Sequence, residues 1–267
     1  MTGTRLSILI SIFLLTSVIS VVTGSTSLIT VPAMMQFRID PKTALATNMF
    51  ALTLMSLGAV VPFRRSQDLN RKRLPLLIAL TLAGSLIGAF LLLLMPSRSV
   101  AVIVPSAMIA VALFSLLYRR SGVSEGLGHP PPYAEMIGYC LTFLLGIYGG
   151  FFSGGYVTIL TAVYVALFRM SFLEAIAATK VMNVFSSAVA TGVFMRHGLV
   201  DYRLGLILGA AMLVGGLLGA QFAIRIGNES LRRIFLAAVW LLGLKALLFD
   251  VLGEHLGWDR RPALDSR

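Results

Sequence analysis

The sequence predicts an all-α integral membrane protein with about eight transmembrane helices in two repeated halves, the first helix of each half being discontinuous. Three observations lead to this prediction. Hydrophobic residues make up 57% and charged residues only 12% of the 267 residues, and the mean hydropathy is +0.90, whereas soluble domains carry about a quarter charged residues. Apolar stretches long enough to cross a hydrocarbon layer of about 30 Å recur along the chain. Short motifs recur in the same order in both halves.

Eight stretches have the length and composition of membrane spans. They cover residues 6–22, 43–63, 74–95, 100–118, 135–152, 172–195, 204–224 and 231–249. One polar connection rich in Gly and Pro divides the chain nearly in half. We therefore predict a first transmembrane repeat at 1–118, a linker loop at 119–134, a second repeat at 135–250 and a polar C-terminal tail at 251–267.

The first span, residues 6–22, also resembles a cleaved signal peptide, because a basic residue precedes it and small polar residues follow it. Its counterpart in the second half favours a span that is retained. Three further motifs support a duplication. Residues 27–31 match residues 155–159, residues 46–48 match 178–180, and residues 84–89 match 215–220.

The distribution of charged residues indicates how the protein is oriented in the membrane and does not indicate a polyanionic partner. The formal net charge is +11, but the basic residues lie at span ends and form no patch on a soluble fold, so we exclude nucleic acid as a partner. Grouping the loops by side leaves an excess of Lys and Arg on the side of both termini, which predicts cytoplasmic termini. An even number of spans per copy predicts parallel repeats, related by an axis along the membrane normal.

Two apolar stretches, residues 6–37 and 135–168, are too long for one crossing and are interrupted at 23–27 and 149–155 by residues that favour turns. We interpret both as discontinuous helices. Irregular backbone at membrane depth is tolerated where protein buries it or water lines it, and paired interruptions in two halves point to a transport site. Close helix packing is the alternative role of small residues, and it explains Gly84, Gly88, Gly215 and Gly219 better than the interruptions.

Lys180 is the most informative residue of the chain. The helix that contains it has a predicted capping box, Ser171-x-x-Glu174, and Asp40-Pro41 starts its counterpart. Lys180 then lies about 12 to 14 Å into its helix. A lysine at the bilayer centre costs about 2.5 to 3.5 kcal/mol on insertion scales, and no acid in a neighbouring span is an evident partner. A charge in this place predicts an anion site. Snorkelling of the side chain to the interface is the alternative.

The predicted substrate site combines residues of both interruptions with residues of the two helices that follow them. Asn183 and Ser187 share the helix face of Lys180. The complete predicted set is Lys180, Asn183, Ser187, Asn48, Thr47, Thr179, Ser25, Ser27, Ser153, Gly154 and Gly155. We predict no catalytic residue, no metal ligand and no cofactor.

Among the functions, a secondary transporter or facilitator of small anions is favoured, since the chain has no Walker A loop to drive a primary pump. An intramembrane enzyme would need a Ser-Lys dyad or a similar set, but Ser187 and Lys180 are two helical turns apart, about 10 Å, too far for direct proton transfer. A membrane subunit of a larger complex has no positive feature in its favour. The expected partners are a small anion and the lipid bilayer, and a homo-oligomer is left open.

Several motifs resemble those of the TauE/SafE sulfite exporter family over nearly the whole chain. They are Gly24-Ser25-x-Ser27-x-x-Thr30-x-Pro32, Ala177-Ala178-Thr179-Lys180-x-x-Asn183, and Gly198-Leu199-Val200-Asp201-Tyr202-Arg203 leading to Gly215-x-x-x-Gly219-Ala220. The first interruption of that family is usually a denser glycine run than the one found here. The resemblance implies a multi-pass protein of the bacterial inner membrane that exports sulfite or an organosulfur oxyanion. Small carboxylates are the alternative substrates.

Overall fold

A computed structural model describes residues 3–24, 26–64, 72–100, 102, 106 and 130–245. The helices in this part of the chain are α1 (Gly3–Thr23), α2 (Ser27–Gln36), α3 (Pro41–Phe63), α4 (Leu74–Leu94), α6 (Pro132–Phe151), α7 (Tyr156–Phe168), α8 (Phe172–Arg196) and α9 (Tyr202–Lys245). Six of them, α1, α3, α4, α6, α8 and α9, contain stretches long and apolar enough to cross a membrane. The predicted class, an all-α integral membrane protein, is confirmed.

The described residues test only part of the predicted number of membrane spans. The predicted span 100–118 lies almost entirely outside the described residues. The predicted spans 204–224 and 231–249 both fall on α9, which is described as far as Lys245 and is kinked at Gly227. The count of eight spans therefore stays a prediction. Helix α6 begins at Pro132, inside the predicted linker 119–134, with a proline in its first turn.

Both predicted discontinuous helices are present. Gly24 lies between α1 and α2 with a φ of 75°, and Gly155 lies between α6 and α7 with a φ of 77°. Only glycine adopts this left-handed backbone without a steric cost. Gly24 directly follows the last residue of α1. Helix α6 ends at Phe151 and is followed by the extended residue Phe152, and Gly155 is the N-cap of α7.

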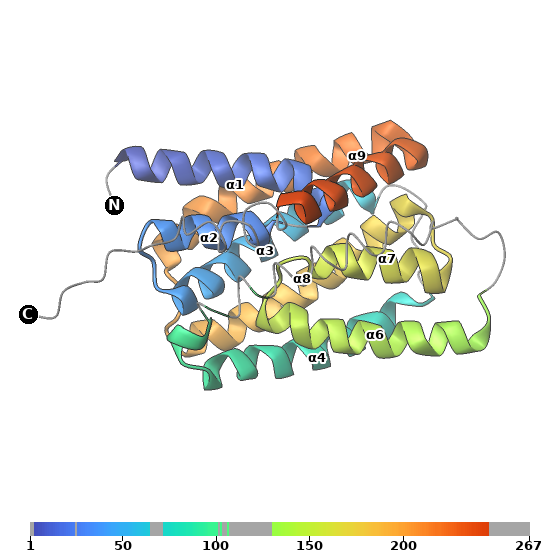
Figure 1. The fold of residues 1–267 in the computed structure, drawn as a ribbon, viewed down its shortest axis with the longest axis horizontal. Coiled ribbons are helices and arrows are strands. Elements are labelled where there is room, and N and C mark those ends of the chain that lie inside the picture. The colour runs from blue at the N-terminus through green and yellow to red at the C-terminus, as the bar shows by residue number, and fades with distance from the viewer. Residues whose placement is uncertain are drawn as a thin grey trace, which may run out of the picture.

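The helices of the first half pack on helices of the second half. In Figure 1, α1 and α9 lie at one side of the bundle, α4 and α6 at the other, and α3 and α8 between them. Along α4, Thr81 and Ser85 donate hydrogen bonds in turn to Met182 Sδ (3.4 Å) and Ser186 Oγ (2.7 Å) of α8. The residue numbers of these partners increase in the same direction along both helices, so α4 and α8 are parallel. The glycine contacts of α4 show that it is also parallel to α6.

The other three of the six long apolar helices run in the opposite direction. Thr53 and Ser56 of α3 form hydrogen bonds with Thr191 (3.4 Å) and Asn183 (2.7 Å) of α8. The residue number thus rises along α3 while it falls along α8, so the two helices are antiparallel. Successive glycines of α9 contact residues of increasing sequence number on α1 and on α3, so α9 is parallel to both helices. Helices α1, α3 and the first part of α9 are therefore antiparallel to α4, α6 and α8.

These directions correct the prediction of parallel repeats. The helices that would correspond in a duplication, α1 with α6, α3 with α8 and α4 with α9, run in opposite directions, which is the arrangement of inverted repeats. The prediction was wrong because it counted residues 6–22 as a crossing that delivers the chain to the far side. Helices α1 and α3 run in the same direction. The chain between them, α2, therefore turns back, so that α3 starts at the end where α1 started (Figure 1).

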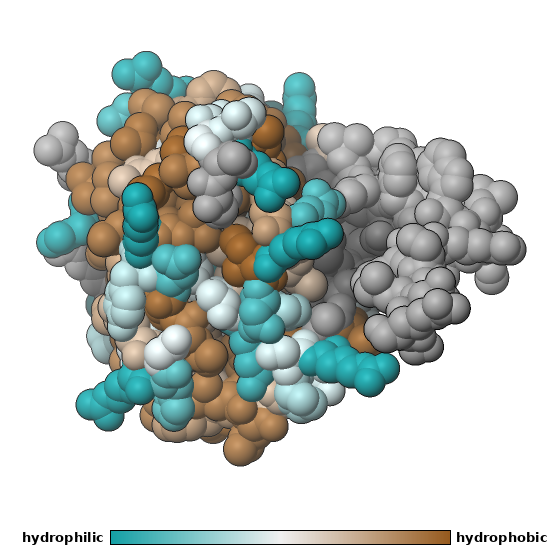
Figure 2. Space-filling view, turned by 90° about the vertical axis from the view of Figure 1, so that its left-hand side faces the viewer, coloured by the Kyte–Doolittle hydropathy of each residue, from teal (hydrophilic) through white to brown (hydrophobic). Residues whose placement is uncertain are grey.

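The correction also regroups the loops. Arg38 and Lys42 now lie at the same end as Arg196, because the start of α3 meets the end of α8. The loops that the sequence analysis groups on one side therefore do not all lie at one end, and the orientation of the termini stays a prediction. Figure 2 views the end at which α1 begins, with hydrophilic side chains across it and hydrophobic ones around them.

The predicted N-cap residues of α3 and α8, Asp40 and Ser171, are confirmed. The Asp40 carboxylate accepts hydrogen bonds from the backbone amides of Lys42 (3.0 Å) and Thr43 (3.3 Å). Ser171 Oγ accepts from the amide of Glu174 at 3.2 Å. Each cap satisfies amides that a helix start leaves without intrahelical partners.

The predicted packing role of the small residues is also confirmed. A Cβ atom at Gly84 would lie 2.5 Å from the carbonyl oxygen of Phe143, and one at Gly88 would overlap that of Ile147. Gly215 and Gly219 of α9 give α1 an equally close approach. Small residues let membrane helices gain dispersion contacts that lipid does not supply.

We predict that Gly88→Ala destabilises the protein by about 1 to 3 kcal/mol, because the added methyl group forces α4 and α6 apart. Gly192→Ala is the matched control: it lies inside α8, and its Cβ would meet nothing within 4 Å. The melting temperature of purified protein in detergent should fall for Gly88→Ala and stay constant or rise slightly for Gly192→Ala. Equal melting temperatures would contradict the close approach.

Candidate functional site

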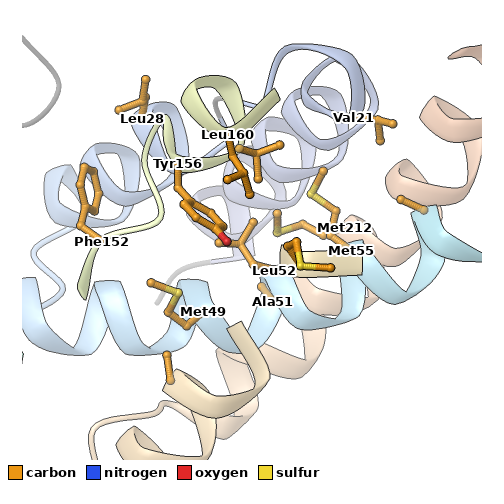
Figure 3. Packing of buried hydrophobic residues seen from close by; sticks show 14 of the residues in the cluster. Val21, Leu28, Met49, Ala51, Leu52, Met55, Phe152, Tyr156, Leu160 and Met212 are labelled. Carbon is orange, nitrogen blue, oxygen red and sulfur yellow. The ribbon is translucent and has the colours of Figure 1, made fainter. Parts of the chain in front are cut away.

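The two helix interruptions touch each other inside the bundle. Thr158 Oγ1, in the first turn of α7, donates a 2.6 Å hydrogen bond to the carbonyl of Thr23, the last residue of α1. A Cβ atom at Gly24 would lie 2.6 Å from the backbone nitrogen of Thr158. Position 24 therefore requires glycine both for its positive φ and for this backbone approach. Figure 3 shows Tyr156 and Leu160 of α7 among side chains of α1, α2, α3 and α9.

Four helix ends meet at this point. Helices α1 and α6 end at the interruptions, and α2 and α7 begin there. Neither helix start is capped by the side chain of its N-cap residue: Thr26 makes no hydrogen bond to the amides of α2, and Gly155 has no side chain. Uncapped N-termini present N–H groups and positive partial charge, which suit an anion. The C-termini of α1 and α6 bring negative partial charge to the same place.

A narrow pocket lies between the interruptions and helices α3 and α8. The side chains around it leave a space too small for a water-sized sphere. Its lining, as far as the chain is described, contains four hydroxyl- or amide-bearing residues, one lysine and three apolar residues. The lining residues are Gly24, Thr26, Ser27, Leu52, Ser153, Val157, Lys180 and Asn183.

Lys180 supplies the charge of the pocket. Its side chain is buried, with 1% of the residue exposed, and Nζ donates a 3.0 Å hydrogen bond to the carbonyl of Ser20 on α1. Among the described residues, no carboxylate lies within 4.0 Å of Nζ. The snorkelling alternative is therefore wrong, because the ammonium stays inside the bundle. An ammonium has three N–H donors, so the bond to Ser20 leaves donors for a ligand.

Asn183 lies one helical turn beyond Lys180 and carries an unused acceptor. Its Nδ2 donates a 2.7 Å hydrogen bond to Ser56 Oγ on α3. Its Oδ1 is buried and has no hydrogen-bond partner in the described structure. A buried polar atom without a partner costs about 1 to 3 kcal/mol, and such an atom in a pocket indicates a place for a ligand.

Asn48, the counterpart of Lys180 in the first half, has a different role. Its Nδ2 donates to Ser27 Oγ at 2.9 Å, and its Oδ1 accepts from Thr30 Oγ1 at 2.7 Å. Both ends of the amide are thus used to hold α2 against α3. Asn48 positions the pocket residue Ser27 and is not itself in the pocket lining.

Three further predicted residues have hydrogen bonds directed away from the pocket. Ser187 Oγ donates to the carbonyl of Asn183 on its own helix. Thr179 Oγ1 donates to the carbonyl of Ile176 at 2.9 Å. Thr47 Oγ1 accepts from the amide of Asp201 at 3.0 Å and so fixes the turn between α8 and α9. None of the three is among the lining residues.

The predicted residues of the second interruption divide in the same way. Ser153 lines the pocket. Gly154 and Gly155 shape the turn: the Gly154 carbonyl accepts a 2.6 Å hydrogen bond from Tyr148 Oη, and Gly155 has a positive φ. Ser25 lies outside the described residues. The structure thus brings together Lys180, Asn183, Ser27 and Ser153.

The sequence analysis did not predict two residues, Ser56 and Ser20, that accept hydrogen bonds from pocket residues. Ser56 is eight residues after Asn48 on α3, and this helical spacing could have placed it on the same face. Ser20 acts through its backbone carbonyl, for which a side-chain pattern gives no signal. Their partners are Asn183 and Lys180.

Comparisons with known proteins agree with a membrane transporter. Proteins described as probable membrane transporters are similar to this chain over most of its length. One from Sinorhizobium is 27% identical over 85% of this chain and 86% of its own length. YfcA from Escherichia coli K12 is 26% identical, over 94% and 92%. One from Haemophilus influenzae is 27% identical, over 92% and 95%. No solved structure matches the chain.

A family model described as sulfite exporter TauE/SafE matches residues 9–246. This range includes both helix interruptions and every residue of the pocket lining. Because the match extends over most of the chain, the protein belongs to the sulfite exporter TauE/SafE family.

Proposed function

We propose that the protein is a secondary transporter or facilitator that moves a small anion through the pocket at the helix interruptions. A sulfur oxyanion such as sulfite is the leading substrate class, and a small carboxylate is the alternative. The observation that carries the proposal is the buried ammonium of Lys180, which has a carbonyl but no carboxylate partner among the described residues. The family match and the names of the relatives support the transporter class.

The pocket offers what an anion loses when it leaves water. Burying an anion in an apolar medium is costly unless charge and hydrogen bonds replace its hydration. Lys180 provides the charge, and the hydroxyl groups of Ser27 and Ser153 can donate hydrogen bonds. The hydroxyl group of Thr26 is engaged with Ser20 Oγ and Met55 Sδ. The uncapped starts of α2 and α7 add N–H donors.

Transport also requires the pocket to open, since its lining is narrower than a water-sized sphere. The lining comes from both halves: Ser27 and Leu52 belong to the first, Ser153 and Lys180 to the second. A movement of one half against the other would widen the pocket toward one end of the bundle, as in transporters with inverted repeats. The bacterial relatives support a location in a bacterial inner membrane.

The arrangement does not favour an intramembrane enzyme. A serine nucleophile needs a base within hydrogen-bond reach. Ser187 Oγ instead donates to its own helix, and Lys180 Nζ donates to Ser20. Neither contact activates a hydroxyl group.

We predict that Lys180→Met lowers sulfite flux in proteoliposomes at least about tenfold, because the substrate loses the one full countercharge that the described part of the pocket provides. Lys42→Met is the control: Lys42 Nζ also donates to a carbonyl, that of Leu93, but at a helix end away from the pocket. Its flux should equal that of the wild type. The proposal fails for sulfite if wild-type liposomes release it no faster than empty liposomes, and for Lys180 if the two variants behave alike.

A second comparison separates a serine inside the pocket from one outside it. Ser27→Ala removes a lining hydroxyl and leaves Asn48 Nδ2 without its acceptor, so flux should fall about tenfold. Ser187→Ala removes only a bond within one helix, and its flux should stay within about twofold of the wild type. The same liposome assay measures both variants. The assignment of the lining is wrong if Ser187→Ala has the larger effect.

A further inference from the structure

The net charge of the pocket is the sum of the charges of its side chains and of the helix ends that meet there. Among the described lining residues, Lys180 alone has a full charge. The C-termini of α1 and α6 and the N-termini of α2 and α7 contribute partial charges of opposite sign and similar size, which offset one another. The pocket therefore carries about one net positive charge. A bound monoanion neutralises it, whereas a dianion leaves one uncompensated negative charge in a buried site, which is costly.

The Asn183 amide adds a requirement of a different kind. Its Nδ2 is held by Ser56, so that Oδ1 is the atom left over in the pocket. A carbonyl oxygen can only accept a hydrogen bond. An anion that consists of acceptor atoms alone would face this oxygen without a hydrogen between them, whereas an anion with an O–H group would supply the missing donor.

We infer that the pocket selects a monoanion that carries its own hydrogen-bond donor, such as a hydrogen oxyanion or a small hydroxy acid, and that Asn183 Oδ1 is the atom that recognises the donor. This inference rests on the proposed function and specifies its substrate. Lys180 binds the anionic group and Asn183 binds the hydroxyl group. Ser56 is the positioning residue, because its Oγ accepts the hydrogen bond from Nδ2 and leaves Oδ1 for the ligand.

Two pairs of anions of equal charge and nearly equal shape test the inference. Glycolate and propionate, and 2-hydroxyethanesulfonate and 1-propanesulfonate, each differ by a hydroxyl group in place of a methyl group. Sulfate serves as a dianion without a hydrogen-bond donor. Sulfite at neutral pH serves as a control that tests whether the pocket binds the proposed substrate at all. Affinities come from the concentration dependence of the melting temperature of the full-length protein in detergent.

We expect the hydroxyl-bearing member of a pair to bind about tenfold more tightly than the methyl-bearing one, and more tightly than sulfate. Asn183→Leu should abolish the preference within a pair and retain binding of both members through Lys180. Ser56→Ala should weaken the preference, since the freed amide can turn its NH₂ group toward the ligand. Ser56→Ala is the second test if Asn183→Leu does not fold.

The outcomes separate this inference from the proposed function. Equal affinities within both pairs, or tighter binding of sulfate, would overturn the inference while leaving an anion site that depends on Lys180. If sulfite, sulfate and all four probes leave the melting temperature of the wild type unchanged, the proposed anion transport itself is refuted.

Discussion

The structure depends on how the backbone is satisfied where two membrane helices are interrupted. Hydrocarbon offers no hydrogen bonds, so each interruption must find its partners in protein. The interruptions find them in each other and in α8: Thr158 donates to the carbonyl of Thr23, and Lys180 donates to that of Ser20. These two bonds join the halves at the pocket. The groups that complete the backbone of α1 also line or flank the pocket.

The opposite directions of corresponding helices follow from the same interruptions. Because α2 turns back along α1 and α7 along α6, each pair enters the bundle and returns to the end from which it came. The interruptions of both halves then lie at the same depth and face each other. An inverted arrangement places a site between the halves, where a small relative movement can expose it to either end. The two breaks, the pocket and the proposed alternation of access thus have one structural origin.

The site shows which signals are local enough to be found in a sequence. Lys180 could be identified because a charge inside an apolar stretch is costly wherever its helix packs. Asn183 could be identified because it shares a helix face with Lys180. Ser187 and Thr179 have equally suitable side chains, yet their hydroxyl groups donate to carbonyls of their own helix. Short polar side chains on a helix often choose such bonds, and sequence does not show which ones do. Ser56 and Ser20 enter the site only through the crossings of α3 and α1 with α8.

The sequence by itself determined the membrane class, the positions of both interruptions, the helix caps at Asp40 and Ser171, and the buried charge of Lys180. Each follows from hydrophobicity, from turn or capping chemistry, or from the cost of a charge in lipid, and these quantities depend on a residue and its near neighbours along the chain. Tertiary structure alone decided the direction of the repeats, because one returning helix, α2, reverses every later crossing. It also decided that Asn48 serves as a brace while Asn183 keeps a free acceptor, because the partners of a buried amide come from other helices.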